Sequence, residues 1–149
     1  MAVGSNLGDR LQNIQTVQQK LNTSEIKVLR TSPFYETQAL CRPDQDFMPD
    51  FLNGVFEVKT SLSPEALLNA IEKIERDMGR TSKSDWSPRV IDLDILFYGD
   101  QIIDTAHLQI PHPEIQNRWF VLKPLSDLIP DFKHPLLLKT VQQLLSELT

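Results

Sequence analysis

The chain of 149 residues has little of what several classes of protein require. It has a single cysteine, Cys41, which excludes an internal disulfide bond and a metal site built from several thiolates. No run approaches the roughly 20 apolar residues of a membrane-spanning helix, and no charged-then-apolar signal opens the chain, so we expect a cytoplasmic protein. The formal net charge of −5 argues against broad nucleic-acid binding, which depends on neutralising phosphates. No Ser/His/Asp triad or Cys/His pair stands out for covalent catalysis.

The composition is that of one folded domain. Apolar residues make up 40% of the chain and charged residues 23%, which is close to the usage of globular proteins and argues against disorder. A chain of this length can bury a sizeable core, and the sequence contains no internal repeat or low-complexity segment. We therefore expect a single domain over residues 1–149.

The hydrophobic pattern predicts strands and helices in the order β-α-β-β-α-β. The predicted elements are a short strand at 1–3, a helix over 7–21, strands over 26–32 and 51–60, a helix that begins at 63–65 and ends near Gly79, and a strand that reaches Phe97. This order is typical of a ferredoxin-like α+β fold, an antiparallel sheet with both helices on one face. Helical patterns near 117–125 and 140–148 predict a C-terminal helical extension. The other sheet face or the sheet edge would be free for a ligand, and two long loops, 37–50 and 80–88, could fold over it.

Two carboxylates, Asp92 and Asp94, stand two residues apart in the last of these predicted strands. Because strand side chains alternate between faces, both point to one side, and the apolar residues Ile91, Leu93, Ile95 and Phe97 point to the other. Neighbouring carboxylates on a half-buried surface repel each other and are costly to desolvate. Mg²⁺ would compensate them, with Arg89 close by for a phosphate. For a bare Asp-x-Asp pattern, the solvated outer face of an edge strand is the more common arrangement.

Other side chains suit a ligand but also allow a structural interpretation. Glu75 borders the apolar stripe of the second predicted helix, either as a solvated rim carboxylate or as part of a site. Trp86 either packs over the core edge or stacks against an aromatic ligand such as adenine. His112, held between two prolines, suits a phosphate contact or a turn. The stretch Gly4–Gly8 lacks the Gly-Lys-Ser/Thr ending of a phosphate loop and is interpreted as a strand-to-helix turn.

Three further residues could recognise a flat ring. The primary amide of Asn53 offers both a donor and an acceptor, which fits the edge of a heterocycle, or it bonds to a neighbouring loop. Phe51 and Phe120 could sandwich such a ring, or they could be ordinary core residues.

Five motifs together resemble those of the 6-hydroxymethyl-7,8-dihydropterin pyrophosphokinase family. They are Gly4–Arg10, Ser32–Thr37, Asp50–Asn53, Pro88–Asp94 and Ile110–Pro113. They follow one another in the order of the family and cover nearly the whole chain. The Pro-Arg-x-x-Asp-Leu-Asp-Ile segment is the most specific of them.

The resemblance implies an enzyme of folate biosynthesis, a transferase that moves the β,γ-pyrophosphoryl unit of ATP to the hydroxymethyl group of the dihydropterin and releases AMP. It implies two Mg²⁺ ions as cofactors, held by Asp92 and Asp94. It also implies the site residues, which are Asp92, Asp94, Arg89 and Arg118 for catalysis, Thr37, Leu40, Phe51, Asn53 and Phe120 for the pterin, and Glu75, Lys83, Trp86, Arg89, Ile95, His112 and Arg118 for ATP. The expected partners are the two small-molecule substrates, without nucleic acid or membrane, and the expected state is a monomer, with a weak dimer as the alternative.

The chain departs from the family pattern at a few places. Its first strand is short, His107 stands where some members carry a phosphate-binding arginine, and loop 80–88 has fewer basic residues than in some members. These departures bear on the affinity for ATP more than on the type of reaction. Two other functions stay open: a ferredoxin-like ligand-binding or regulatory module without catalysis, and another metal-dependent nucleotidyl or phosphoryl transferase.

Overall fold

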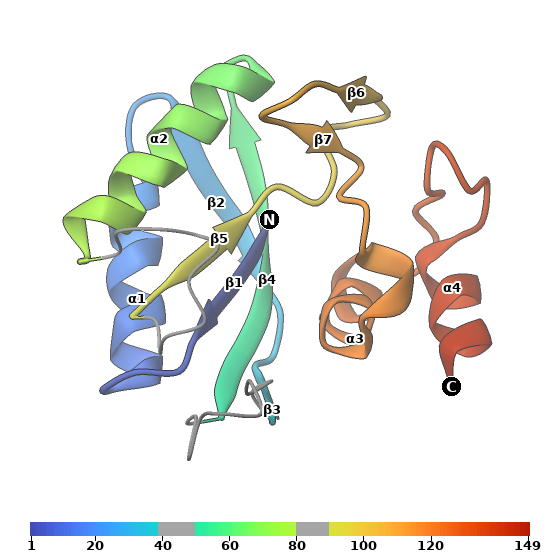
Figure 1. Ribbon diagram of the computed structural model, residues 1–149, viewed down its shortest axis with the longest axis horizontal. Helices are drawn as coiled ribbons and strands as arrows, with labels where there is room; N and C mark the ends of the chain where they lie inside the picture. The colour runs from blue at the N-terminus through green and yellow to red at the C-terminus, as the bar shows by residue number, and fades with distance from the viewer. Residues whose placement is uncertain (39–49, 80–89) are drawn as a thin grey trace.

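The computed structural model describes residues 1–38, 50–79 and 90–149 (Figure 1). They form an α+β fold with an antiparallel sheet, which confirms the predicted class. The elements in chain order are β1 (Ala2–Ser5), α1 (Arg10–Leu21), β2 (Ile26–Thr31), β3 (Tyr35–Thr37), β4 (Phe51–Thr60), α2 (Pro64–Asp77), β5 (Asp92–Asp94), β6 (Ile103–Asp104), β7 (Gln109–Ile110), the 3₁₀ turn η1 (Ile115–Asn117), α3 (Trp119–Leu128) and α4 (Val141–Leu148). Within these ranges no helix combines the length and the apolar character needed to cross a membrane.

Strand β1 lies between β4 and β5 in the main sheet. The strand order is β2-β4-β1-β5, every pair is antiparallel, and β3 also pairs with β4. In this register Gly4 of β1 lies opposite Asn53 of β4 on one side and opposite Asp92 of β5 on the other. Segments far apart in the sequence therefore meet across β1.

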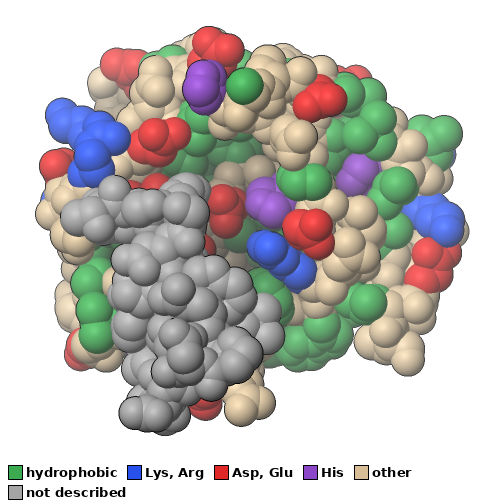
Figure 2. All heavy atoms as spheres, viewed as in Figure 1, with side chains coloured by type: hydrophobic (Ala, Val, Ile, Leu, Met, Phe, Trp, Pro, Cys, Tyr) green, Lys and Arg blue, Asp and Glu red, His purple; other side chains and the backbone are tan. Residues whose placement is uncertain are grey.

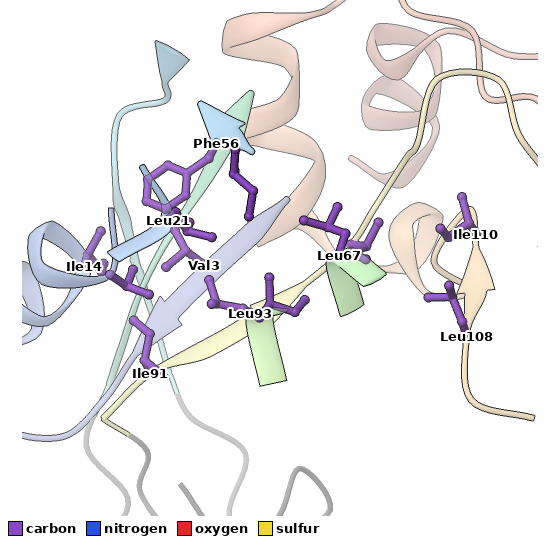
Figure 3. Close-up of a cluster of buried hydrophobic side chains, with 13 residues drawn as sticks. Val3, Ile14, Leu21, Phe56, Leu67, Ile91, Leu93, Leu108 and Ile110 are labelled. Carbon is purple, nitrogen blue, oxygen red and sulfur yellow. The ribbon is translucent and has the colours of Figure 1, made fainter. Parts of the chain in front are cut away.

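Each face of the sheet has its own hydrophobic core. Helices α1 and α2 cover one face, and α3 and α4 lie on the opposite side (Figure 1). Because consecutive strand residues point to opposite faces, Val55 of β4 packs toward α3 and Phe56 packs toward α1 and α2. The first core (Figure 3) consists of Val3, Ile14, Val17, Leu21, Ile26, Phe56, Leu67, Ile71, Ile91, Leu93, Ile95, Leu108 and Ile110. The second consists of Val55, Leu96, Ile115, Val121, Leu122, Leu125, Val141, Leu144 and Leu145.

The ends of the first two helices follow from local side-chain chemistry. The Asp9 carboxylate accepts a hydrogen bond from the amide of Gln12 at 3.2 Å, and the Ser63 hydroxyl accepts one from the amide of Ala66 at 3.2 Å. Both satisfy amides that the first helical turn leaves without partners. Helix α2 ends before Gly79, whose φ of +96° favours glycine.

The predicted extent of the aspartate strand is wrong. Strand β5 ends at Asp94, and the alternation of faces ends after Leu96, since Leu96 and Phe97 both pack in the second core. Phe97 was expected on the face of Leu93. Its ring instead packs in the second core against Phe132, with ring centroids 4.7 Å apart.

The C-terminal helical extension is confirmed, with shifted boundaries. Helix α3 begins at Trp119 rather than near 117, because Ile115–Asn117 form a 3₁₀ turn, and α4 follows the capping residue Thr140. The first predicted helix begins at Arg10 rather than at 7, since Gly8, with a φ of +72°, lies in the turn before it. These C-terminal helices also cover part of the sheet face that was expected to be free of helices.

Burial of His134 predicts a pH dependence of stability. Its side chain is 3% exposed, and its Nδ1 accepts hydrogen bonds from the amides of Leu136 and Leu137, both at 3.1 Å. Burial lowers the pKa of His134 below its ordinary value of 6.5. The unfolded chain therefore binds the proton more readily, so this contribution to stability is present above pH 6.5 and is lost as the pH falls.

We expect the free energy of unfolding of wild type to decrease between pH 7.5 and 5.5 more steeply than that of His134→Gln, measured by urea denaturation. The control variant, His107→Gln, changes an exposed histidine and should keep the wild-type slope. Equal slopes for wild type and His134→Gln would contradict the role of the buried ring.

Candidate active site

The sheet carries a row of three residues on the face opposite α1 and α2. Asn53, Gly4 and Asp92 lie side by side on β4, β1 and β5, and Asp94 lies two residues further along β5. Their strand neighbour Leu93 points into the first core, so both aspartates face the other way. Adjacent strands are about 4.8 Å apart, which separates Asn53 from Asp92 by about 10 Å. Figure 2 shows acidic, basic and histidine side chains close together on the visible surface.

Gly4, in the middle of this row, has no room for a side chain. A Cβ atom at Gly4 would lie 3.0 Å from Oδ1 of Asn53 and 3.6 Å from Cδ1 of Phe51. The first distance is tighter than an ordinary contact, so any side chain here would crowd the amide. A glycine inside a strand often marks the close approach of a ligand. The interpretation of Gly4 as part of a turn is wrong, because it lies within β1.

Asn53 has a defined orientation. It is 8% exposed, and its Nδ2 donates a hydrogen bond to Oγ1 of Thr37 at 2.8 Å. Thr37 is the last residue of β3 and pairs with Phe51 of β4. Three of the residues that the resemblance assigns to the pterin, Thr37, Phe51 and Asn53, are thus brought together by the pairing of β3 with β4.

Glu75 of α2 binds the backbone of the strand that carries the aspartates. This residue of α2 is 3% exposed, and its Oε2 accepts a hydrogen bond from the amide of Leu93 at 2.9 Å. Its interpretation as a solvated rim carboxylate is therefore wrong. The chain thus places three carboxylates around β5, with Asp92 and Asp94 half-buried on the face opposite α1 and α2. Such a concentration of negative charge favours a cation.

The donors present fit Mg²⁺. Carboxylate oxygens are the ligands that this ion prefers, and it commonly takes only one or two of them, with water and substrate phosphates completing its shell. The described ranges contain no group of three or more His, Cys, Asp or Glu side chains placed to enclose a metal. Asp92 and Asp94 would therefore hold an ion only together with a ligand that brings oxygens of its own.

Segment 110–120 lies beside this face and carries three more of the expected residues. His112 Nδ1 accepts a hydrogen bond from the amide of Glu114 at 3.1 Å, which leaves the ring proton on Nε2. Arg118 precedes α3, and its guanidinium lies 5.8 Å from the centre of the Phe120 ring. Phe120 packs partly against the second core.

The remaining expected residues divide into two groups. Ile95 is 5% exposed and belongs to the first core. Leu40, Lys83, Trp86 and Arg89 lie outside the described residues, as do Cys41 and most of the two long loops.

Comparison with known proteins agrees with the motifs. The model of the 7,8-dihydro-6-hydroxymethylpterin-pyrophosphokinase family matches residues 1–130. The chain is 38% identical over 149 residues to the 2-amino-4-hydroxy-6-hydroxymethyldihydropteridine pyrophosphokinase of Aquifex aeolicus, covering 100% of this chain and 91% of that one. The chain belongs to the dihydropterin pyrophosphokinase family.

Two other relatives differ in length. The pyrophosphokinase of Synechocystis is 38% identical over 148 residues, which cover 99% of this chain and 74% of that protein. The folic acid synthesis protein fol1 of Pneumocystis carinii is 47% identical over 135 residues, which cover 91% of this chain but 18% of that protein. The chain thus spans about a fifth of the length of the fol1 relatives that it matches.

Sequence reasoning missed several residues around the site of this pyrophosphokinase family member. The Arg10 side chain forms an ion pair with Glu36 and donates to the carbonyl of Asp50 at 3.0 Å. The Tyr35 hydroxyl donates to the Asp127 carboxylate, and this hydrogen bond raises the pKa of Tyr35. Both contacts join distant segments, so no local pattern indicates them, although Arg10 and Tyr35 do stand in two of the family motifs.

Removing the Glu75 side chain should destabilise the fold. We expect Glu75→Ala to lower the free energy of unfolding by about 1–3 kcal/mol, because the buried amide of Leu93 loses its acceptor. Glu75→Gln, which retains an acceptor oxygen, should lower the free energy of unfolding by less. Chemical denaturation measures both, with Glu72→Ala on the same helix as the control. Wild-type stability of Glu75→Ala would show that the bond contributes nothing.

Proposed function

We propose that the chain transfers pyrophosphate from ATP to 6-hydroxymethyl-7,8-dihydropterin and releases AMP. The observation that carries the proposal is the row Asn53–Gly4–Asp92, with an amide at one end, a glycine without a side chain in the middle and a pair of carboxylates at the other end. Such a row supports two ligands of different chemistry held about two strand spacings, roughly 10 Å, apart. Membership of the pyrophosphokinase family supports this reaction.

The pterin would lie at the Asn53 end. Its carboxamide offers a donor and an acceptor to the edge of the heterocycle, and the hydrogen bond to Thr37 fixes how that amide is turned. Phe51 and Phe120, on β4 and α3, would contact the faces of the ring. The role of Leu40 stays a prediction.

The triphosphate would lie at the aspartate end. Asp92 and Asp94 would hold two Mg²⁺ ions, which when bound supply the charge neutralisation that attack on a phosphate anion requires. The Nε2–H of His112 would donate to a phosphate oxygen, and Arg118 would add a second positive charge. Glu75, beneath β5, would keep the two aspartates in place. The roles of Ile95, Lys83, Trp86 and Arg89 on this side stay predictions.

The reaction needs positioning and charge stabilisation rather than a covalent intermediate. The hydroxymethyl oxygen of the pterin would form a bond to the β-phosphorus of ATP, while the bond from that phosphorus to the bridging α,β-oxygen breaks and AMP leaves. The hydroxyl proton would pass to Asp94 or to a water beside it. The side chains of the row would align the oxygen with the phosphorus.

We further infer that the core has the ferredoxin-like βαββαβ topology. The strand order β2-β4-β1-β5 and the antiparallel pairing support it. A single domain, a monomeric state without nucleic-acid or membrane partners, and a cytoplasmic location stay predictions.

The test is product analysis with purified protein, ATP, Mg²⁺ and 6-hydroxymethyl-7,8-dihydropterin. We expect AMP and the pterin diphosphate in equal amounts, resolved by ³¹P NMR, and no product when EDTA removes the metal. Release of ADP would instead indicate an ordinary phosphoryl transferase. Pterin binding that needs no Mg²⁺, without turnover, would indicate a ligand-binding module.

Asp94→Asn tests the metal role with almost no change in shape. Because the amide cannot compensate a cation, we expect kcat/KM to fall by at least ~10²-fold, the loss typical of one charge-stabilising group. Asp100→Asn, at an exposed turn, is the control and should retain wild-type activity. Near-full activity of Asp94→Asn would rule out Asp94 as a ligand of the metal.

A further inference from the structure

Strand β3 is the short strand beside Asn53, at the end of the row where the pterin would lie. It has three residues, and it pairs with β4 through Tyr35 opposite Asn53, Glu36 opposite Leu52 and Thr37 opposite Phe51. So short a strand has little stability of its own. Yet it supplies the hydroxyl of Thr37 that orients the amide of Asn53. Any separation of β3 from β4 would leave that amide without its partner.

One side chain joins the two strands at this end. Arg10, the first residue of α1, forms an ion pair with Glu36 in the middle of β3, and its Nη1 donates to the carbonyl of Asp50 at 3.0 Å. Asp50 immediately precedes β4. The two nitrogens of one planar guanidinium thus bind β3 and the residue that precedes β4, from the α1 side.

The direction of these contacts follows from strand alternation. Glu36 points toward α1, whereas Tyr35 and Thr37 point to the face of Asn53. The contact of Tyr35 with Asp127 at the far side confirms this arrangement. Arg10 therefore lies on the α1 side of the sheet. It contacts β3 there and does not reach the face that carries Asn53.

We propose that Arg10 is a positioning residue for the pterin, acting through Glu36 and Thr37 on the amide of Asn53. The inference rests on the proposed function and adds a residue to it. A lysine would not replace the arginine, because an ammonium group is a point charge that cannot reproduce a planar fork directed at two separate acceptors. Exposed ion pairs contribute little to global stability, so the effect should be confined to the pterin end.

The chain offers a matched control. Arg30 and Glu57 form a similar exposed pair between β2 and β4, with 2.6 Å between Arg30 Nη2 and Glu57 Oε2. Arg30→Gln removes the same kind of contact from the same sheet, away from β3. The variants to compare are Arg10→Gln, Arg10→Lys and Arg30→Gln.

The experiment measures binding of 6-hydroxymethylpterin by calorimetry, the KM for dihydropterin and for ATP, and the free energy of unfolding. We expect Arg10→Gln to weaken pterin binding and raise the pterin KM about 10-fold, the size of a 1.4 kcal/mol effect, with the ATP KM within about 2-fold. Arg10→Lys should resemble Arg10→Gln, and Arg30→Gln should resemble wild type. In the double variant Arg10→Gln/Thr37→Val, the losses should not add, because both act on Asn53.

Three results would overturn the inference. Wild-type pterin binding by Arg10→Gln would do so directly. If Arg10→Gln raised the KM for dihydropterin and for ATP equally and also lowered the free energy of unfolding, Arg10 would have a general structural role. Additive losses in the double variant would show that Arg10 acts by another route. If wild type itself binds no pterin, the proposed function fails first, so the two failures are distinguishable.

Discussion

The register of β1 between β4 and β5 is the constraint on which the site depends. Because strand side chains alternate with a period of two, a register shift of β5 by a single residue would turn Asp92 and Asp94 toward the first core and Leu93 away from it. The buried side chains of Val3 and Leu93 therefore fix the register through the hydrophobic effect. The same burial that stabilises the sheet sets the amide and the carboxylates about 10 Å apart on the face opposite α1 and α2.

The polar groups of the site are oriented by hydrogen bonds to other groups of the protein. Thr37 orients Asn53, Glu75 holds the backbone between the two aspartates, and the amide of Glu114 sets the protonated nitrogen of His112. Each of these supports comes from a different element. This arrangement agrees with a site in which catalysis depends on prior orientation, since phosphoryl chemistry of this kind requires alignment and charge neutralisation more than a reactive side chain.

Local patterns in the sequence were enough for much of the fold. The bounds of β4 and the common face of Asp92 and Asp94 depend on neighbours within a few residues, and the structure agrees with both. The extension of β5 to Phe97 failed because Phe97 packs in the second core against Phe132, a residue much further along the chain.

Contacts between distant segments account for the rest of the site. The interpretation of Gly4 as a turn residue fails because its place opposite Asn53 and Asp92 appears only once three strands are aligned. The burial of Glu75 could not be decided from a helical pattern that puts it at the border of the apolar stripe. Arg10 and Glu36 stand 26 residues apart, and only the packing of α1 against the sheet brings them together.

The central claim is that pterin and metal occupy the two ends of one row of residues. It is tested most directly by replacing Mg²⁺ with paramagnetic Mn²⁺ in the presence of an α,β-methylene analogue of ATP and measuring the NMR relaxation of bound 6-hydroxymethylpterin. The account predicts strong relaxation of the pterin protons, corresponding to a distance from the metal of no more than about 10 Å, which is lost in Asp94→Asn. If the relaxation rates of the bound pterin protons were the same with Mn²⁺ as with Mg²⁺, the claim would be contradicted.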